Sequence, residues 1–145
     1  MKVGLDTSCL VPLMSSWHEH HKATLSTLEA LKKQNNDLIV AAPAVLECFS
    51  VLTRLPERIR ITPSEAAGRL SENIAQNFQM VGVDPETCWA AMQHLTERDL
   101  GGGLIYDAII AHSCASAGAT ILLTWDVLDF RRVAPAGLTI QEPLS

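Results

Sequence analysis

The stretch KVGLDTSCLV, Lys2–Val11, decides the expected fold, because an apolar segment that ends on a carboxylate opens the chain. Val3 and Leu5 are typical of a short buried strand, and Asp6 follows directly at its end. Residues 8–14 are predicted to form a helix over that strand. Because a carboxylate is expensive to bury without a partner, the position of Asp6 suggests a function.

Four further apolar segments resemble the first. The predicted strands are Leu38–Ala42, Met80–Val83, Thr120–Thr124 and Leu138–Ile140. Strands that are apolar on both faces belong to parallel sheets with helices on either side. We therefore expect a single α/β domain over residues 1–145, a three-layer α/β/α sandwich around a central, mainly parallel sheet of about five strands.

The segments between the strands have helical patterns and recognisable start signals. Helices are predicted over residues 18–34, 43–55, 63–78 and 104–117, with another opening at Asp84. Proline in a first turn and a capping residue before it are typical of helix starts. The helix that opens at Asp84 is expected to turn Trp89, Met92 and Leu95 inward.

The composition limits the possible partners. There are 11 Lys and Arg residues against 16 Asp and Glu residues, a formal net charge of −5, which argues against a broad basic face for nucleic acid. No apolar run approaches the roughly 20 residues of a membrane span, and Asp6 interrupts any signal-peptide pattern. We expect a soluble cytoplasmic protein without membrane contact. The four cysteines are spaced singly and are predicted to be reduced core residues.

Four carboxylates are expected at one edge of the sheet. Ligands of open parallel sheets bind beyond the carboxyl ends of the strands, where the strand order changes direction. Asp6 follows the first strand and Asp126 the fourth, while Glu47 and Asp107 lie one turn into helices that begin at that edge. A cap or a buried ion pair explains each acid alone at least as well as catalysis does. The four together favour a cation site.

The type of ligand points to a hard divalent cation. Carboxylates without a cluster of imidazoles or thiolates suit Mg²⁺ or Mn²⁺. Such an ion binds a phosphate oxygen and makes its bound water more acidic, so an acidic protein can still bind a phosphodiester. The WHEHH segment, Trp17–His21, has no further ligands at a standard zinc spacing, and we interpret it as a solvated helix start.

At this point the sequence resembles a known family. LDTSCL, a lone Glu47 after the second strand, YDAIIA and LLTWDVLDF look like the ordered motifs of PIN-domain ribonucleases, especially the VapC-type toxins of bacterial toxin–antitoxin pairs. The resemblance spans essentially the whole chain. It implies a PIN-like sandwich, an Mg²⁺- or Mn²⁺-dependent endoribonuclease activity on RNA, and inhibition by a cognate VapB-type antitoxin.

The resemblance also assigns roles to particular residues. Asp6, Glu47 and Asp107 match the three family acids, and Asp126 matches the fourth position, ranked ahead of Asp129 as a metal ligand. Two hydroxyl residues, Ser8 and Thr124, match positions that help to order the acids or waters in the family. Capping and turn hydrogen bonds explain these two hydroxyls equally well.

Two other functions fit parts of the sequence. Asp6 lies where aspartyl-phosphate enzymes of similar fold carry their nucleophile, although those enzymes usually have a second Asp where Ser8 stands. A noncatalytic RNA- or protein-binding module with a PIN-like fold is the third possibility, and the complete acidic set argues against it. Metal-dependent RNA cleavage without a phosphorylated protein intermediate separates the three.

Two surfaces are predicted to contact macromolecules. Arg54, Arg58 and Arg60 follow the Glu47 helix and are expected to contact the RNA backbone, although a solvated basic surface explains each of them equally well. The apolar run Leu10–Trp17 exceeds what one helix can turn toward a core, so it is expected to bind the antitoxin, and ordinary packing together with a homodimer contact explains it equally well. An antitoxin arginine that enters the acidic cleft would compete with the metal.

Overall fold

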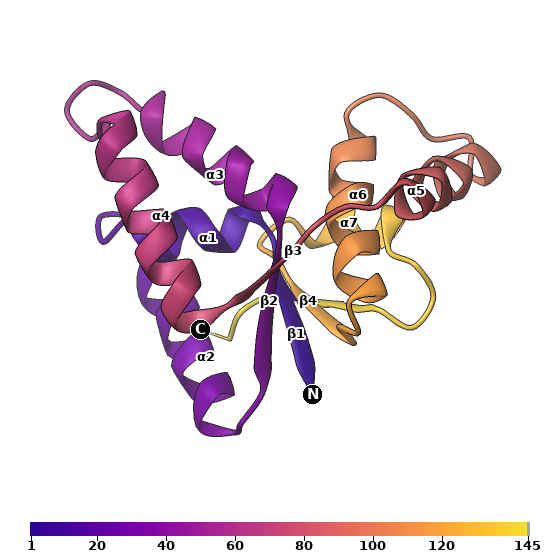
Figure 1. Cartoon of the computed structure of the whole chain (residues 1–145), viewed down its shortest axis with the longest axis horizontal. Coiled ribbons are helices and arrows are strands. Elements are labelled where there is room, and N and C mark those ends of the chain that lie inside the picture. The colour runs from indigo at the N-terminus through magenta and orange to yellow at the C-terminus, as the bar shows by residue number, and fades with distance from the viewer. Residues whose placement is uncertain (145) are drawn as a thin grey trace.

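The computed structural model describes residues 1–144 and has three layers with a central sheet (Figure 1). The strands are β1 (Lys2–Leu5), β2 (Asp37–Ala41), β3 (Gln79–Val81), β4 (Ile121–Leu123) and β5 (Thr139–Gln141). Their spatial order is β3-β2-β1-β4-β5, and every neighbouring pair is parallel. The predicted five-stranded α/β/α sandwich is confirmed.

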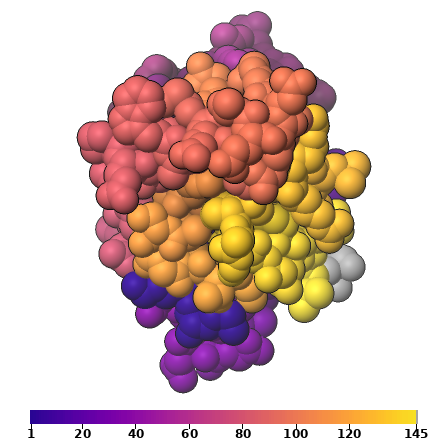
Figure 2. Space-filling model, turned by 90° about the vertical axis from the view of Figure 1, so that its right-hand side faces the viewer, coloured from indigo at the N-terminus to yellow at the C-terminus, as the bar shows by residue number. Residues whose placement is uncertain are grey.

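Helices cover both faces of this sheet (Figure 1). One side carries α1 (Thr7–Met14), α2 (His21–Lys33), α3 (Ala42–Thr53) and α4 (Pro63–Asn77), and the other carries α5 (Pro85–Glu97), α6 (Leu104–Ser116) and α7 (Val127–Val133). Figure 2 faces the second side and shows α5, α6 and the C-terminal segment covering it. Among the described residues, no helix is both long and apolar enough to cross a bilayer.

The central strand β1 is buried on both faces. Val3 and Leu5 are each 1% exposed, and between them Gly4 lies under α6. A Cβ atom on Gly4 would come within 2.9 Å of the Cys114 Sγ atom, so glycine allows α6 to approach the sheet closely. Three of the four free cysteines, including Cys114, are buried, as expected of reduced core residues.

The predicted helix starts are confirmed where a capping side chain was recognised. The Thr62 hydroxyl accepts a hydrogen bond from the Glu65 amide at 3.1 Å, which caps α4. The Asp84 carboxylate accepts one from the Thr87 amide at 2.7 Å, which caps α5. These bonds satisfy backbone donors that a first helical turn leaves free.

One helix is shorter than predicted, and another was not predicted at all. The helix expected from residue 18 begins only at His21, because the preceding residues form tight turns in which the His18 amide donates to the Ser15 carbonyl and the His21 amide donates to the His18 carbonyl, both at 3.0 Å. A ring nitrogen of His21 also lies 2.7 Å from the Pro12 carbonyl oxygen, which fixes the chain reversal after α1. The short helix α7 was not predicted.

The predicted inward face of α5 is wrong. Leu95 is buried, but Trp89 is 69% exposed and Met92 is 41% exposed. The buried stripe runs instead through Thr87, Ala91 and Leu95, which are spaced four residues apart. The small Ala91 side chain in the middle of this stripe lets α5 pack against α6, so the helix turns its largest side chains outward.

Of the two alternatives predicted for Leu10–Trp17, most of the run shows ordinary packing and does not form a partner surface. Leu10, Val11 and Met14 are buried, because α1 packs against α2 and α3 as well as against the sheet. A helix enclosed on several sides can bury residues around most of its circumference. Trp17 lies beyond the end of α1 and is 50% exposed.

Candidate functional site

The candidate site lies at the carboxyl edge of the sheet, between β1 and β4. The chain leaves β1 to build β2 and β3 on one side and later returns to place β4 on the other side, so the strand order changes direction here. Asp6 directly follows β1, and Asp126 follows β4. Both acids line a cleft of about 440 Å³ together with Glu47 and Asp107. The structure therefore brings the four predicted acids into one cleft.

Asp6 is the most enclosed of these acids and is 4% exposed. Ser8 Oγ donates to Asp6 Oδ1 at 2.7 Å, and Thr124 Oγ1 donates to Asp6 Oδ2 at 3.1 Å. The two hydroxyl oxygens lie 3.2 Å apart. Because each hydroxyl has one proton, both protons serve Asp6 and fix its carboxylate plane.

The same two hydroxyls also accept hydrogen bonds from the backbone after β4. The Trp125 amide donates to Ser8 Oγ at 2.8 Å, and the Asp126 amide donates to Thr124 Oγ1 at 2.9 Å. Ser8 and Thr124 therefore connect the loop that carries Asp126 to the carboxylate of Asp6. The structure thus contains hydrogen bonds of both predicted kinds, to an acid and to a turn.

Glu47 is held by a residue that was not among the predicted site residues. Thr7 Oγ1 donates to Glu47 Oε2 at 3.1 Å and lies 3.3 Å from the Ala44 carbonyl oxygen. Thr7 is buried at the start of α1, and Glu47 is exposed one turn into α3. The position of Thr7 directly after Asp6 is the signal from which its place in the cleft could have been inferred.

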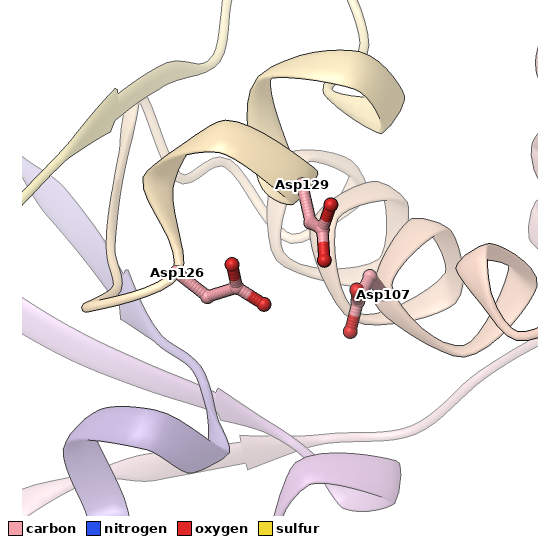
Figure 3. Close-up of side chains that lie close together, drawn as sticks. All are labelled: Asp107, Asp126 and Asp129. Atoms are coloured by element: carbon pink, nitrogen blue, oxygen red, sulfur yellow. The ribbon is translucent and has the colours of Figure 1, made fainter.

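Three aspartates form the tightest acidic group. Asp107, Asp126 and Asp129 each offer a carboxylate oxygen within 4.8 Å of the other two. Figure 3 shows Asp107 on α6 and the other two at the start of α7, with their carboxyl groups turned toward a common space. Asp129 also lies 3.8 Å from the Arg132 guanidinium. Asp126 and Asp129 are thus both within reach of one ion, although Asp126 was ranked first.

Burial and mutual repulsion make several of these acids hard to ionise. Burial, opposed by the Ser8 and Thr124 hydrogen bonds and assisted by the charges of Asp107 and Glu47, raises the pKa of Asp6 to about 7. Burial and the charge of Asp126, followed by those of Glu47 and Asp129, raise the pKa of Asp107 to about 6. The pKa of Asp126 is also raised, by burial and by Asp129. A bound cation would relieve this repulsion.

The four acids of the cleft have no Lys or Arg partner among the residues that the structure describes. Among the described residues, ion pairs within 4.0 Å involve none of Asp6, Glu47, Asp107 and Asp126, and no Lys or Arg lines the cleft. The carboxylate oxygens of Asp107, Asp126 and Asp129, grouped within 4.8 Å of one another, fit Mg²⁺ or Mn²⁺ better than a transition metal that prefers imidazole or thiolate. The donor set therefore fits the ion that the sequence predicted.

The predicted basic cluster lies outside the cleft. Arg54, Arg58 and Arg60 are exposed and occupy the end of α3 and the loop after it. Seven helical positions separate Glu47 from Arg54, which is about 10 Å along the helix axis. RNA contacts by these arginines stay a prediction, and such contacts would be made by nucleotides away from the acids.

Aromatic residues that were not predicted as site residues line the cleft wall. His18, His20 and Trp125 contribute to it, together with Glu19. Trp125 stands between Thr124 and Asp126, so its sequence position could have revealed it. The histidines could not be placed from the sequence, because their contact with the cleft depends on the chain reversal between α1 and α2.

Comparison with known families identifies the class of protein. The sequence matches the PIN domain family over residues 3–135, which is most of the chain. The protein therefore belongs to the PIN-domain family, as its ordered motifs predicted. The acids of the cleft lie on those motifs.

Two individual relatives show which proteins of the family this chain resembles. The chain is 35% identical over 120 residues to ribonuclease VapC40 of Mycobacterium tuberculosis, which covers 83% of this chain and 84% of VapC40. It is 29% identical over 119 residues to ribonuclease VapC27 of the same organism, covering 82% and 81% of the two chains. The predicted resemblance to VapC-type ribonucleases is confirmed.

A solved structure shares the fold at lower sequence identity. A chain of the VapBC2 crystal structure from Rickettsia felis, solved with a DNA fragment from its promoter, superposes with a TM-score of 0.73 at 16% identity over 98% of both chains. At this identity the comparison supports the arrangement of strands and helices alone.

Proposed function

We propose that this protein is an endoribonuclease that needs Mg²⁺ or Mn²⁺, and that it acts in the cytoplasm as a toxin controlled by a VapB-type antitoxin. The observation that carries this proposal is the cleft in which Asp6, Glu47, Asp107 and Asp126 meet, with no Lys or Arg of the described residues in its lining. The relatives named ribonuclease over most of the chain support RNA as the substrate.

Within this proposal, the metal would be held by Asp107 and Asp126, with Asp6, Glu47 and Asp129 as the neighbouring oxygen ligands. A bound ion neutralises charge on a phosphate oxygen and lowers the pKa of a coordinated water. The carboxylates would supply the negative charge that retains the ion.

The protein groups orient these carboxylates before substrate binds. Ser8 and Thr124 hold both oxygens of Asp6, so its carboxylate cannot rotate away from the cleft. Thr7 holds one oxygen of Glu47, whose other oxygen has no hydrogen-bond donor among the described residues. We assign to this second oxygen the role of accepting a proton from the water that attacks the scissile phosphate.

The geometry favours this mechanism over an aspartyl-phosphate enzyme. A nucleophilic carboxylate needs a free oxygen with access to phosphorus. Asp6 is 4% exposed, and each of its oxygens already accepts a hydrogen bond from a hydroxyl group. Asp6 is better placed to hold a cation than to attack phosphorus.

The direct test is cleavage of total RNA by the purified protein. We expect discrete products with Mg²⁺ or Mn²⁺, no cleavage in EDTA, and little cleavage with Ca²⁺, whose looser coordination positions water less strictly. Asp107→Asn is the matched variant and should be inactive in every condition. Undiminished cleavage after thorough chelation would contradict the metal-dependent mechanism, and absence of cleavage would favour the noncatalytic module.

The antitoxin needs a different surface from the one predicted on α1. A groove of about 420 Å³ between α3 and α4 has an almost wholly apolar lining that includes Leu46, Phe49, Leu70, Ile74 and Met80. Leu46 and Met80 are 68% and 48% exposed. An exposed apolar groove of this kind accommodates an amphipathic helix.

We assign this groove to the antitoxin because it lies on the helix that carries Glu47. A partner helix in the groove could extend a basic side chain past Leu46 into the acidic cleft, which no Lys or Arg of the described residues lines. Binding of the partner and of Mn²⁺ would then be competitive.

Co-expression with the adjacent upstream reading frame tests the partner assignment. The chain alone should arrest growth, and the small co-encoded protein should restore it. Met80→Glu should abolish this rescue while RNA cleavage persists, and Trp89→Glu, at an exposed site on α5, should leave rescue intact. Rescue that survives Met80→Glu would exclude the groove, and normal growth with the chain alone would contradict the toxin assignment.

A further inference from the structure

Four aromatic rings form a continuous row that ends at the acidic cleft. Trp17 lies 5.5 Å from His18, and His18 lies 5.6 Å from His20, measured between ring centroids. His20 then stacks on Trp125 at 3.8 Å with an angle of 9° between the ring planes. The first three residues come from the loop between α1 and α2, whereas Trp125 follows β4.

Hydrogen bonds hold the inner end of this row in place. The Trp125 Nε1–H donates to Thr24 Oγ1 at 3.0 Å, and Thr24 Oγ1 donates to the His20 carbonyl oxygen at 2.7 Å. The Trp125 amide is bound to Ser8 Oγ, which in turn donates to Asp6. The ring stack and the buried carboxylate therefore belong to one rigid network, and the stack has a fixed position relative to the acids.

The row is accessible although its members are aromatic. The His20 side chain is 37% exposed, and Trp17 is 50% exposed. His18, His20 and Trp125 line the same 440 Å³ cleft as Asp6, Glu47, Asp107 and Asp126. A stack built only for stability would gain more by complete burial, so its exposure on the cleft side is consistent with binding a flat ligand.

We propose that His18, His20 and Trp125 form a binding wall for one unpaired nucleobase of the RNA, next to the phosphate held at the acids. This inference rests on the proposed ribonuclease function and adds to it the side chains that contact a base. Aromatic rings stack on bases of any sequence, and single-stranded segments are the ones whose bases can be turned out to meet them.

His18 also offers a directional contact. Its Nδ1 accepts the His20 amide at 3.0 Å, which leaves the proton of the neutral ring on Nε2. That N–H can donate to a base carbonyl or to a phosphate oxygen. The same hydrogen bond occupies the Nδ1 lone pair, so this wall is better suited to a base than to a metal ion.

The test uses a short RNA that contains one cleavage site, mapped first on total RNA. Versions of this substrate carry a single abasic nucleotide at each position beside the scissile bond. With the wild-type protein, one such position should lower kcat/KM about tenfold, since stacking of one base contributes at about this level. His20→Ala should lower kcat/KM on the intact RNA by a similar factor and should add no further loss on the abasic RNA.

Matched variants separate stacking from a general structural effect. His20→Phe, which keeps a flat ring against Trp125, should recover most of the activity, and His18→Ala, which removes the Nε2 donor and the acceptor of the His20 amide, should reproduce the defect. Trp89→Ala removes an exposed aromatic residue outside the cleft and should behave like the wild type. Thermal unfolding of each variant identifies any loss that is due to misfolding.

The outcomes distinguish this inference from the proposed function. Suppose that the wild-type protein cleaves the RNA, but that the abasic nucleotide lowers kcat/KM by the same factor in the wild type and in His20→Ala. The base-binding wall is then refuted and the ribonuclease function stands. If His20→Ala weakens only inhibition by the co-encoded partner, the wall binds that protein instead, which also refutes the inference. Absence of cleavage by the wild type would refute the proposed function itself.

Discussion

The amide of Trp125 donates a hydrogen bond to Ser8 Oγ at 2.8 Å, which joins the loop after β4 to the start of α1. The same Ser8 hydroxyl donates a hydrogen bond to Asp6 Oδ1 at 2.7 Å. Two segments more than 100 residues apart in sequence thus share one serine hydroxyl at the carboxyl edge of the sheet. The acids are positioned by the fold before any ligand arrives, which is the condition for efficient electrostatic catalysis.

Replacement of Ser8 by alanine should therefore impair catalysis more than folding. The substitution removes a donor to Asp6 and an acceptor for the Trp125 amide. Loss of a group that orients a metal ligand typically lowers metal affinity or activity by about 10- to 100-fold. We expect a loss of this size in kcat/KM and in Mn²⁺ affinity, measured by RNA cleavage and by calorimetry.

Ser113→Ala is the matched control for this experiment. The Ser113 hydroxyl is buried on α6 and has no hydrogen-bond partner among the described residues. Its removal should leave RNA cleavage unchanged and stability equal or slightly higher, because an unsatisfied buried hydroxyl is unfavourable. Equal activities for the Ser8 and Ser113 variants would show that the hydroxyl network does not position Asp6.

Replacement of Asp107 by asparagine should separate activity from stability. The charge of Asp107 is repelled by Asp126, Glu47 and Asp129, so the neutral side chain should raise the melting temperature of the metal-free protein while abolishing cleavage. Asp84→Ala should lower the melting temperature and leave cleavage unchanged, because Asp84 caps α5 and lies outside the cleft. Thermal unfolding in EDTA and cleavage with Mn²⁺ measure both effects, and residual activity in Asp107→Asn would remove this residue from the mechanism.

The raised pKa values predict opposite pH trends for the metal-free and metal-bound protein. The pKa of Asp6 rises from 3.8 to about 7, so its protonated form stabilises the metal-free fold. That contribution is complete below pH 3.8 and is lost as pH rises through about 7. Metal binding needs the ionised form, so Mn²⁺ affinity and cleavage should increase over the same interval.

The measurement is thermal unfolding in EDTA between about pH 5 and about pH 8, an interval that brackets the pKa of Asp6 at about 7. Asp6→Asn carries no titrating group at this position, so its melting temperature should fall less across the interval than that of the wild type. Parallel curves for the two proteins would contradict the assignment of a raised pKa to Asp6.

Much of the fold and site could be predicted because the relevant signals are local. A parallel strand that ends on Asp6 or shortly before Asp126 places each acid at the same edge, whatever the details of packing. The helix caps at Thr62 and Asp84 were equally predictable from the sequence, since each cap lies within four residues of its partner. These features need no knowledge of tertiary contacts.

The errors arose where tertiary packing selects among equivalent patterns. On α5 the apolar side chains allow more than one inward face, and contact with α6 selects the one centred on Ala91 over the one with Trp89. The cleft wall of His18, His20 and Trp125 was not predicted, for a related reason. His20 meets Trp125 only because the chain reverses after α1, and that reversal depends on the pairing of His21 with Pro12.

The last prediction is that bound RNA extends from the cleft to the exposed arginines at the end of α3. Replacement of Arg54, Arg58 and Arg60 together by glutamine should weaken RNA binding, because the acidic cleft itself attracts RNA only through its metal. For every phosphate that the protein no longer neutralises, the plot of log affinity against log salt should become shallower by about 0.7, so three phosphates give about 2. Fluorescence anisotropy with the inactive Asp107→Asn protein measures this slope without cleavage.

A control must remove equal charge elsewhere, since any loss of positive charge weakens long-range attraction to RNA. Lys32 and Lys33 end α2, before β2 begins and so at the opposite edge of the sheet, and Arg98 follows α5. Their joint replacement by glutamine changes the net charge by the same amount and should leave the salt slope near that of the parent protein. If both triple variants shift the slope equally, the Arg54–Arg60 cluster acts through net charge alone and does not contact the RNA backbone.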